Sequence, residues 1–301
     1  MNPPASTLFT APPEWQWLII FYFFLGGLAG GAYFIAVLID LFGAPLDRPL
    51  ARLGYLLAFP LTVVCGVLLI VDLSRPLRFW HMLLQSETLR PMFKAWSPMS
   101  VGSWALLLFG AVAFISFLAA LRDDDPGTRT GLARLRPPGL LGTIVACIGG
   151  ALGFFIAGYT GVLLTVTNRP IWADTNLLGL VFLISGASTA AALLGLLARR
   201  RARASLTGLH ALERFDSVLL VLELIAIVAL IASLGGMARL WLNAWGALLV
   251  VGVIVLGILA PLVLYRRSLR FGGAGGALAA VLVLVGGFLL RVVVILSSEG
   301  V

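Results

Sequence analysis

The sequence predicts an all-α integral membrane protein, a single transmembrane domain over residues 1–301 built from eight helices in two four-helix halves. Composition is the first reason: 60% of the residues are hydrophobic and 11% are charged, whereas about a quarter of a soluble domain is charged. The mean hydropathy of +1.06 agrees, because a soluble protein of 32.0 kDa cannot bury so much apolar surface. The third reason is a set of eight apolar runs, each close to the roughly 20 helical residues that cross a bilayer core.

The runs are continuously apolar and lack the alternation of transmembrane strands, so each is expected to be a helix. In order, they cover approximately residues 16–42, 53–72, 99–121, 140–167, 175–198, 216–234, 244–264 and 275–297. Proline or charged residues end most of them, since neither extends an apolar helix in lipid. These breaks are residues 43–45, 74–76, 123–126, 168–170, 199–203 and 266–267. Abundant glycine inside the runs is expected to let neighbouring helices pack closely.

The distribution of basic residues predicts the orientation. An even number of helices puts both termini on one side, together with every second loop. The loops on that side carry six Lys and Arg residues, and the loops on the opposite side carry 14. By the positive-inside rule the opposite side is cytoplasmic, so both termini should lie on the outer face of a bacterial cytoplasmic membrane. The first 14 residues contain no basic residue, so the first run is expected to stay as a helix rather than be cleaved as a signal peptide.

Charge, cysteine and histidine counts exclude several functions. The net charge of +8 fits arginines in cytoplasmic loops, so no nucleic-acid partner is expected. Cys65 and Cys147 are expected to be small buried residues, although a disulfide stays open, and two thiols are too few for an iron–sulfur cluster. His81 and His210 are predicted on opposite sides of the membrane, so they cannot share a haem. No metal site is expected, and electrons would have to come from or go to a partner protein.

Polar residues converge at the outer ends of the first four predicted helices. Tyr22 lies early in the first helix, Asp72 ends the second, and Tyr159 lies near the end of the fourth. Arg75 and His81 follow in the loop after the second helix. Polar groups in lipid are costly, which makes each a candidate functional residue. The alternatives are an interfacial aromatic belt for the tyrosines, a simple ion pair between Asp72 and Arg75, and a surface histidine.

A quinone suits such a cluster. Its head group needs hydrogen-bond partners in a mostly apolar cleft, and its reduction takes up two protons. Tyr22 and Tyr159 are the expected head-group ligands, and Gly158 and Gly161 leave space around the second. Asp72, acting with Arg75 or His81, is expected to handle protons. One further residue, Gly27, completes the predicted quinone-binding set.

Ionisable residues also occur deeper in the predicted helices. Glu223 and Asp40 are candidates for a proton relay, because a carboxylate in lipid is costly without a function. The alternative for Glu223 is a protonated or hydrogen-bonded structural residue. Asp216 lies at the inner mouth of the sixth helix. Arg291, in the eighth helix, is expected to pair either with Asp72 or with lipid head groups.

Five sequence stretches carry a resemblance to a known family. They are residues 21–31 (FYFFLGGLAGG), 72–79 (DLSRPLRF), 97–104 (SPMSVGSW), 158–164 (GYTGVLL) and 168–172 (NRPIW). In this order they resemble the NrfD/PsrC family, the membrane subunits of polysulfide reductase and related quinone-linked complexes.

The resemblance implies a quinone site, for menaquinone or ubiquinone, beside an iron–sulfur, ferredoxin-like subunit docked on the outer face. A molybdopterin or cytochrome subunit would lie beyond it. Tyr159 falls on the family's quinone-binding tyrosine and Asp72 on its acidic residue after the second helix. Ile19 and Tyr22 stand where the polysulfide reductase branch has asparagine and histidine.

The sequence therefore predicts the membrane subunit of an oxidoreductase complex, which oxidises quinol or reduces quinone and exchanges electrons with the iron–sulfur partner. Coupled proton transfer is part of this prediction. Two alternatives remain open at this stage. One is a passive anchor for a redox complex without quinone chemistry of its own. The other is a secondary transporter or proton channel, which would require charged residues near the middle of the membrane.

Overall fold

The protein is seen in a computed structural model, which describes residues 15–122, 131–200, 205–271 and 275–298. This part of the protein is helical, and its extended pairing is limited to an isolated bridge between Leu84 and Pro91. It contains eight helical spans that are long and apolar enough to cross a membrane. The predicted all-α fold with eight spans is confirmed, and the protein is a multi-pass membrane protein. The division into two halves and the orientation of the termini stay predictions.

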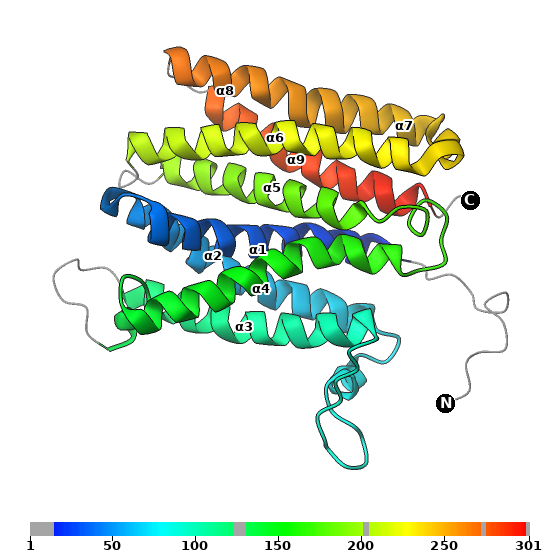
Figure 1. Ribbon diagram of the computed structural model, residues 1–301, viewed down its shortest axis with the longest axis horizontal. Helices are drawn as coiled ribbons and strands as arrows, with labels where there is room; N and C mark the ends of the chain where they lie inside the picture. The colour runs from blue at the N-terminus through cyan, green and yellow to red at the C-terminus, as the bar shows by residue number, and fades with distance from the viewer. Residues whose placement is uncertain (1–14, 123–130, 201–204, 272–274, 299–301) are drawn as a thin grey trace.

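The helices follow one another along the sequence with short 3-10 segments in the connections (Figure 1). The first five long helices are α1 (Trp17–Phe42), α2 (Arg48–Asp72), α3 (Pro98–Arg122), α4 (Leu140–Thr165) and α5 (Leu178–Arg200). They are followed by α6 (Leu206–Leu234), α7 (Ala244–Leu248), the π-helical η6 (Leu249–Leu259), α8 (Ala260–Phe271) and α9 (Gly275–Leu296). The 3-10 segments are η2 (Pro45–Asp47), η3 (Pro76–Met82), η4 (Gly131–Leu135) and η5 (Gly235–Trp241). The predicted break at 123–126 lies outside the described residues.

Two helices begin earlier than predicted. Helix α2 starts at Arg48 instead of residue 53, and α6 starts at Leu206 instead of residue 216. Both extensions contain charged residues, Arg48 and Arg52 in α2 and Glu213 and Arg214 in α6, so the predicted apolar run begins after them although the helix includes them. Ser205 caps α6 by accepting a hydrogen bond from the backbone N–H of Gly208 at 2.8 Å, which fixes its true start.

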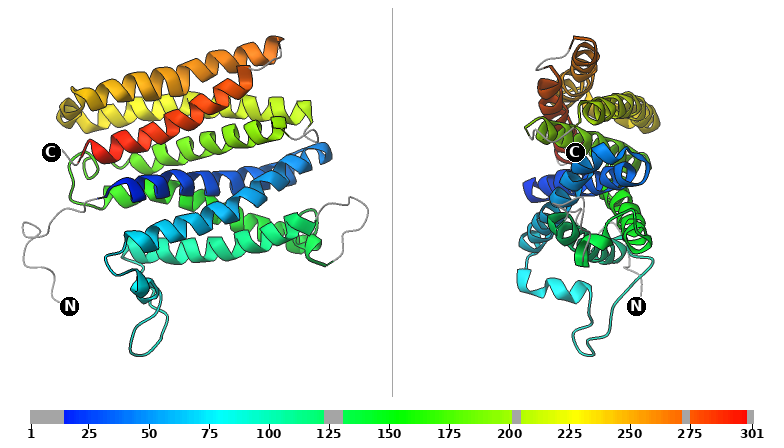
Figure 2. Two further views of the ribbon diagram at one scale, coloured as in Figure 1. Left: turned by 180° about the vertical axis from the view of Figure 1, so that it is seen from behind. Right: turned by 90° about the vertical axis from the view of Figure 1, so that its left-hand side faces the viewer.

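The bundle is organised around α1 and α5. Helix α1 packs against α2, α4 and α5, and α5 packs against α4, α6 and α9 as well (Figures 1 and 2). Glycines allow these crossings: a Cβ on Gly30 would lie 2.3 Å from the carbonyl oxygen of Gly153 on α4. A Cβ on Gly27 would lie 3.3 Å from the Cα of Gly186 on α5. The predicted role of glycine in close packing is confirmed at these positions.

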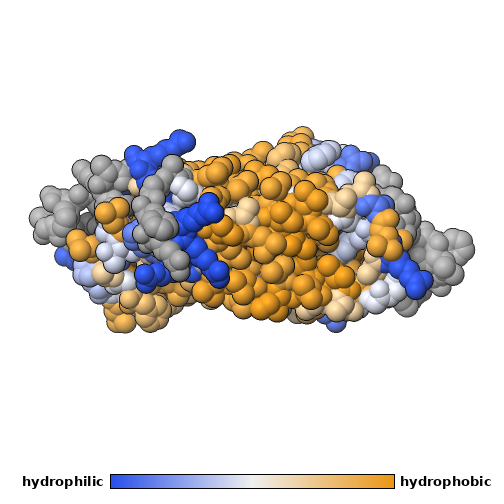
Figure 3. Space-filling model, turned by 90° about the horizontal axis from the view of Figure 1, so that it is seen from above, coloured by the Kyte–Doolittle hydropathy of each residue, from blue (hydrophilic) through white to orange (hydrophobic). Residues whose placement is uncertain are grey.

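The surface has the pattern of a membrane-spanning bundle. Figure 3 shows a broad hydrophobic band across the middle of the molecule, with hydrophilic side chains gathered at both ends. At one end, Trp15 stacks on Trp172, with 5.5 Å between the ring centroids. Trp172 donates a hydrogen bond to the carbonyl oxygen of Val294 at 2.7 Å, and Arg169 donates to that of Ser298 at 3.0 Å. The start of α1, the segment after α4 and the end of α9 therefore meet at one end of the bundle.

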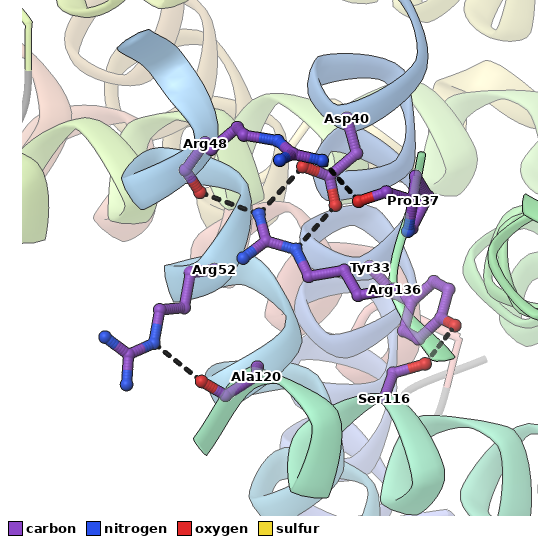
Figure 4. A network of polar contacts seen from close by, with 8 residues as sticks. All are labelled: Tyr33, Asp40, Arg48, Arg52, Ser116, Ala120, Arg136 and Pro137. Carbon is purple, nitrogen blue, oxygen red and sulfur yellow. Dashed lines mark hydrogen bonds and ion pairs between the residues drawn. The ribbon is translucent and has the colours of Figure 1, made fainter. Parts of the chain in front are cut away.

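The opposite end is held by a buried polar network (Figure 4). Arg136 forms a two-point ion pair with Asp40 of α1, with both N···O distances at 2.7 Å. Arg136 also donates to the carbonyl oxygen of Arg48 at 2.8 Å, and Arg48 donates to that of Pro137. This network joins the start of α2 and the segment before α4 to α1. Asp40, a predicted proton-relay residue, is thus held by an arginine.

The two cysteines differ in burial. Cys65 is buried on α2 and Cys147 is exposed on α4, and both are free thiols. The expectation that both are buried is therefore wrong for Cys147. Its run is apolar because the helix face is covered by lipid, and an apolar sequence cannot distinguish that face from the protein interior.

Candidate functional site

A cavity of about 610 Å³ lies among the first four helices, at the end where η3 follows α2. Its walls come from α1, α2, η3, α3 and α4. The lining is mainly apolar, from residues such as Ile19, Phe23, Leu106, Leu107 and Leu163. Its polar members are Tyr22, Thr62, Asp72, Ser103 and Tyr159. Three predicted site residues, from three different helices, therefore line one space.

Tyr159 is the most firmly positioned polar group of the cavity. It is 7% exposed, and its hydroxyl donates a hydrogen bond to the carbonyl oxygen of Pro98 at 2.6 Å. Its ring passes over α3 at Gly102, where a Cβ would lie only 2.1 Å from the Tyr159 hydroxyl oxygen. Phe155, one helical turn earlier, stacks on the ring with 5.5 Å between centroids. Glycine at position 102 is thus the sequence feature that allows this tyrosine to reach the cavity.

Tyr22 and Asp72 complete the polar side of the space. Tyr22 is buried on α1, close to Cys65 of α2 and within electrostatic range of Tyr159. Asp72, at the last position of α2, is exposed and lies where the cavity meets the end of the bundle. Asp72 makes no ion pair with Arg75 in the described parts of the protein, which does not favour the alternative in which these two residues simply neutralise each other.

The remaining predicted quinone-binding residues do not line the cavity. Gly27 follows Tyr22 by five residues, about 140° around a helix, and therefore faces α5 and Arg291. Arg75 is exposed, just beyond the end of α2. His81 stacks on Trp80 with 3.8 Å between ring centroids, and its Nδ1 is 3.0 Å from the carbonyl oxygen of Arg78. Arg75 and His81 lie in the loop near the mouth and not in the cavity wall.

The sequence did not predict the part of the cavity that lies farther from Asp72, toward the middle of the bundle. Phe59, Gly66, Gly110 and Phe114 line it from the middle of α2 and α3. The ring centroids of Phe59 and Phe114 are 4.9 Å apart, which closes the space at its inner end. Apolar residues and glycines inside apolar runs look alike whether they face a neighbour, a cavity or lipid. The spacing of seven residues from Phe59 to Gly66 and of four from Gly110 to Phe114 places each pair on one helix face, and this was the available signal.

A second group of polar residues is buried among α5, α6, α8 and α9. Arg291 is fully buried, and its Nη1 donates to Ser185 Oγ at 2.5 Å and to the carbonyl oxygen of Gly287 at 2.7 Å. Glu223 is buried beside Ser185 and interacts electrostatically with Arg291. Both expected partners of Arg291, Asp72 and lipid head groups, are therefore wrong. The reason is that the arginine faces α5 and α6 inside the bundle.

The same buried group continues toward the other end of the bundle. Asp216 accepts hydrogen bonds from Ser188 at 2.6 Å and from Tyr265 at 2.8 Å. Beyond it, Arg199 donates a hydrogen bond to Glu213. We refer to Arg291, Ser185, Glu223, Ser188, Asp216 and Tyr265 as the buried polar line. It is separated from the cavity, because α1 passes between them at Gly27.

Within the described residues, no three His, Cys, Asp or Glu side chains gather in a way that would hold a metal ion. The chemistry of the cavity is that of two phenols and a carboxylate in an apolar space. Such a space takes an apolar molecule with a few hydrogen-bonding atoms at one end.

Comparison with known proteins identifies the family. A family model described as "Polysulphide reductase, NrfD" matches residues 9–299. One of the polysulfide reductase chains of Wolinella succinogenes is 29% identical over 95% of the present sequence and 94% of its own. Protein NrfD of Escherichia coli K12 is 27% identical over 95% of each sequence. One of the selenate reductase subunits of Mesobacillus selenatarsenatis is 26% identical over 33% of the present sequence and 21% of its own. Because the family model covers all eight helical spans, the protein belongs to the NrfD polysulphide reductase family.

Proposed function

We propose that this protein is the quinone-reactive membrane subunit of a multi-subunit oxidoreductase complex of the bacterial cytoplasmic membrane. It binds menaquinol or ubiquinol, or the corresponding quinone, in the cavity among α1 to α4. One observation carries the proposal: Tyr22, Asp72 and Tyr159 line the polar end of a single apolar cavity. A volume of about 610 Å³ lies within the range of roughly 300–1,000 Å³ found for small-molecule sites.

The hydrogen bond of Tyr159 favours quinol as the bound form. Its only hydroxyl proton is donated to the carbonyl oxygen of Pro98, so the phenol oxygen has lone pairs left to accept from a ligand. A quinol hydroxyl can donate to such an oxygen, whereas a quinone carbonyl cannot. Oxidation of quinol releases two protons, and Asp72 lies at the exposed end of the same cavity, where it can pass a proton to water.

The electrons would leave through a partner. We propose that an iron–sulfur, ferredoxin-like subunit docks on the loop between α2 and α3, with a molybdopterin or cytochrome subunit beyond it. Two relatives are named as components of polysulfide reductase and selenate reductase, which describes them as parts of reductase complexes. Arg75 and His81 lie in this loop beside the mouth, and Leu77 and Trp96 are exposed on it at 89% and 82%. Exposed aromatic and apolar side chains beside arginines are typical of protein interfaces.

Proton transfer along the buried polar line is the second part of the proposal. Glu223 and Asp216 are buried carboxyl groups: Glu223 lies beside Ser185, which accepts from Arg291, and Asp216 accepts from both Ser188 and Tyr265. We propose Glu223 as the relay residue, and we assign Asp40 to the ion pair with Arg136. This same line is what favours the alternative of a proton channel or transporter. That alternative requires proton or solute flux in proteoliposomes without quinol, whereas the quinone proposal requires quinol.

The decisive test is a Tyr159→Phe variant in the intact complex. Loss of the phenol oxygen removes the hydrogen-bond acceptor for quinol, and quinol-linked turnover should fall by about tenfold, which corresponds to one hydrogen bond of about 1.4 kcal/mol. Tyr33→Phe is the matched control, since Tyr33 is also buried and bonded, to Ser116 at 2.6 Å, but lies outside the cavity. Unchanged turnover of Tyr159→Phe in an assembled complex would refute the proposal and favour a passive anchor.

A further inference from the structure

The cavity extends from its polar end as a groove between α2 and α3. On α2 its lining residues are spaced by three to four positions, from Phe59 through Gly66 to Ile70. On α3 the same spacing runs from Ser103 to Phe114. These are the facing sides of the two helices. From Asp72 to Phe59 the groove covers about 20 Å of helix at 1.5 Å per residue.

Two glycines keep the middle of this groove open. A Cβ on Gly66 would meet no atom within 4 Å, and a Cβ on Gly110 would meet only a methyl carbon of Thr62, at 3.6 Å. This differs from Gly30 and Gly153, where a Cβ would collide with the backbone of the neighbouring helix. Gly66 and Gly110 therefore do not serve close helix packing. They leave space.

The groove also opens sideways. Val63 and Leu107 line it and are 46% and 48% exposed, and Phe114 is 43% exposed at its inner end. All three belong to the apolar middle of spanning helices, so the surface onto which the groove opens faces lipid. Thr62 is the polar residue along this stretch, and its hydroxyl already donates to the carbonyl oxygen of Ala58 at 2.7 Å. The groove thus suits a hydrocarbon tail.

We propose, resting on the proposed function, that the apolar tail of the quinol occupies this groove, and that the ligand enters and leaves through the lipid-facing opening past Gly66 and Gly110. The groove is continuous with the space lined by Tyr22, Asp72 and Tyr159, so a molecule with a polar head and a long apolar tail fills both parts. The exposed end at Asp72 then serves protons and not the ligand.

Gly66→Leu tests this in the assembled complex, because a Cβ at this position meets no atom within 4 Å and the new side chain starts in the open groove. We expect it to raise the KM for a decyl-tailed quinol by about tenfold, within the range that overfilling a site costs. The KM for a quinol bearing only the head group should stay unchanged, since that ligand needs no groove. Gly66→Ala, a smaller change, should give a smaller shift of the same sign.

Val67→Leu is the matched control, because Val67 is the next residue of α2, does not line the cavity and is 53% exposed on the lipid side. It should change neither KM. An unchanged KM of Gly66→Leu for the tailed quinol would overturn the groove assignment, as would equal changes for both quinols. If Tyr159→Phe still loses turnover in that case, only the entry route is wrong. If neither variant changes turnover, the proposed quinone site fails as well.

Phospholipid is the competing occupant of the groove. Native mass spectrometry of the purified complex should detect quinone bound to the wild-type protein and less of it bound to Gly66→Leu. Loss of a bound phospholipid with no loss of quinone would overturn the proposal, because the acyl tail of a membrane lipid would then fill the groove.

Discussion

Polar groups lie inside the membrane-spanning bundle in two regions, the cavity among α1 to α4 and the buried polar line among α5, α6, α8 and α9. The surroundings of these groups differ between the two regions. In the cavity, Tyr22 and Tyr159 border an open space kept clear by glycines. In the line, Asp216 and Arg291 are each hydrogen-bonded to neighbouring helices, and the pocket beside Asp216 has a volume of only about 10 Å³. Buried polarity alone therefore does not identify a ligand site. Space beside the polar group does.

The largest expected effect concerns stability in the polar line. Arg291→Met would remove the cation next to Glu223 and leave Ser185 without its donor. Removing one partner of a buried charged pair typically costs about 3–5 kcal/mol. Because Arg291 donates its hydrogen bonds to Ser185 and to backbone carbonyls and interacts with Glu223 electrostatically, we expect the lower end, about 3 kcal/mol, in the free energy of unfolding in detergent. The double variant Arg291→Met with Glu223→Gln should recover part of it. Equal stabilities of the single and double variants would show that the two residues do not interact.

The next effect concerns how the cavity holds Tyr159. Gly102→Ala would place a methyl group where the Tyr159 ring crosses α3. The ring must move away, so we expect quinol-linked turnover to fall while the free energy of unfolding drops by about 1–3 kcal/mol, as in other overpacked sites. Gly26→Ala is the control, since its Cβ would meet its nearest neighbour at 3.7 Å, an ordinary contact. A fully active Gly102→Ala complex would mean that the position of Tyr159 does not matter for turnover.

The smallest expected effect tests whether the buried polar line and the cavity act independently. Ser188→Ala removes one of the hydrogen bonds to Asp216, and hydrogen bonds between membrane helices average about 0.6 kcal/mol. Thermal unfolding should shift slightly, and the KM for quinol should not change, because the polar line is separated from the cavity. A raised KM in Ser188→Ala would contradict that separation and connect Asp216 to the quinone site.

In the cavity region, the sequence predicted the positions of the polar residues that interrupt apolar runs. Tyr22, Asp72 and Tyr159 were predicted to converge because helices alternate in direction, and the cavity contains all three. Gly27 was predicted with them but does not line the cavity, since a position near the same helix end does not fix which side of the helix a residue faces. Gly66 and Gly110 were not predicted, because a glycine that leaves space and a glycine that packs a helix look the same in a sequence.

In the buried polar line, too, the sequence identified the polar residues but not their contacts. Glu223 and Arg291 were recognised as costly in lipid, but their partners were not, because those partners come from α5, far away in the sequence. The early start of α6 and the π-helical stretch of Leu249–Leu259 were also missed. Both depend on backbone hydrogen bonds and capping, to which hydropathy is insensitive.

The amino-acid sequence alone was enough to establish that the protein lies in a membrane, that it crosses with eight helices, and which helix ends carry polar groups. It could do so because the cost of exposing charge and backbone to lipid acts on each segment separately. The three-dimensional packing was needed to establish which side chains share a cavity, which glycines leave space, and which buried charges are paired. These properties depend on the rotation and crossing of helices against each other, which arise from contacts between residues distant in the sequence.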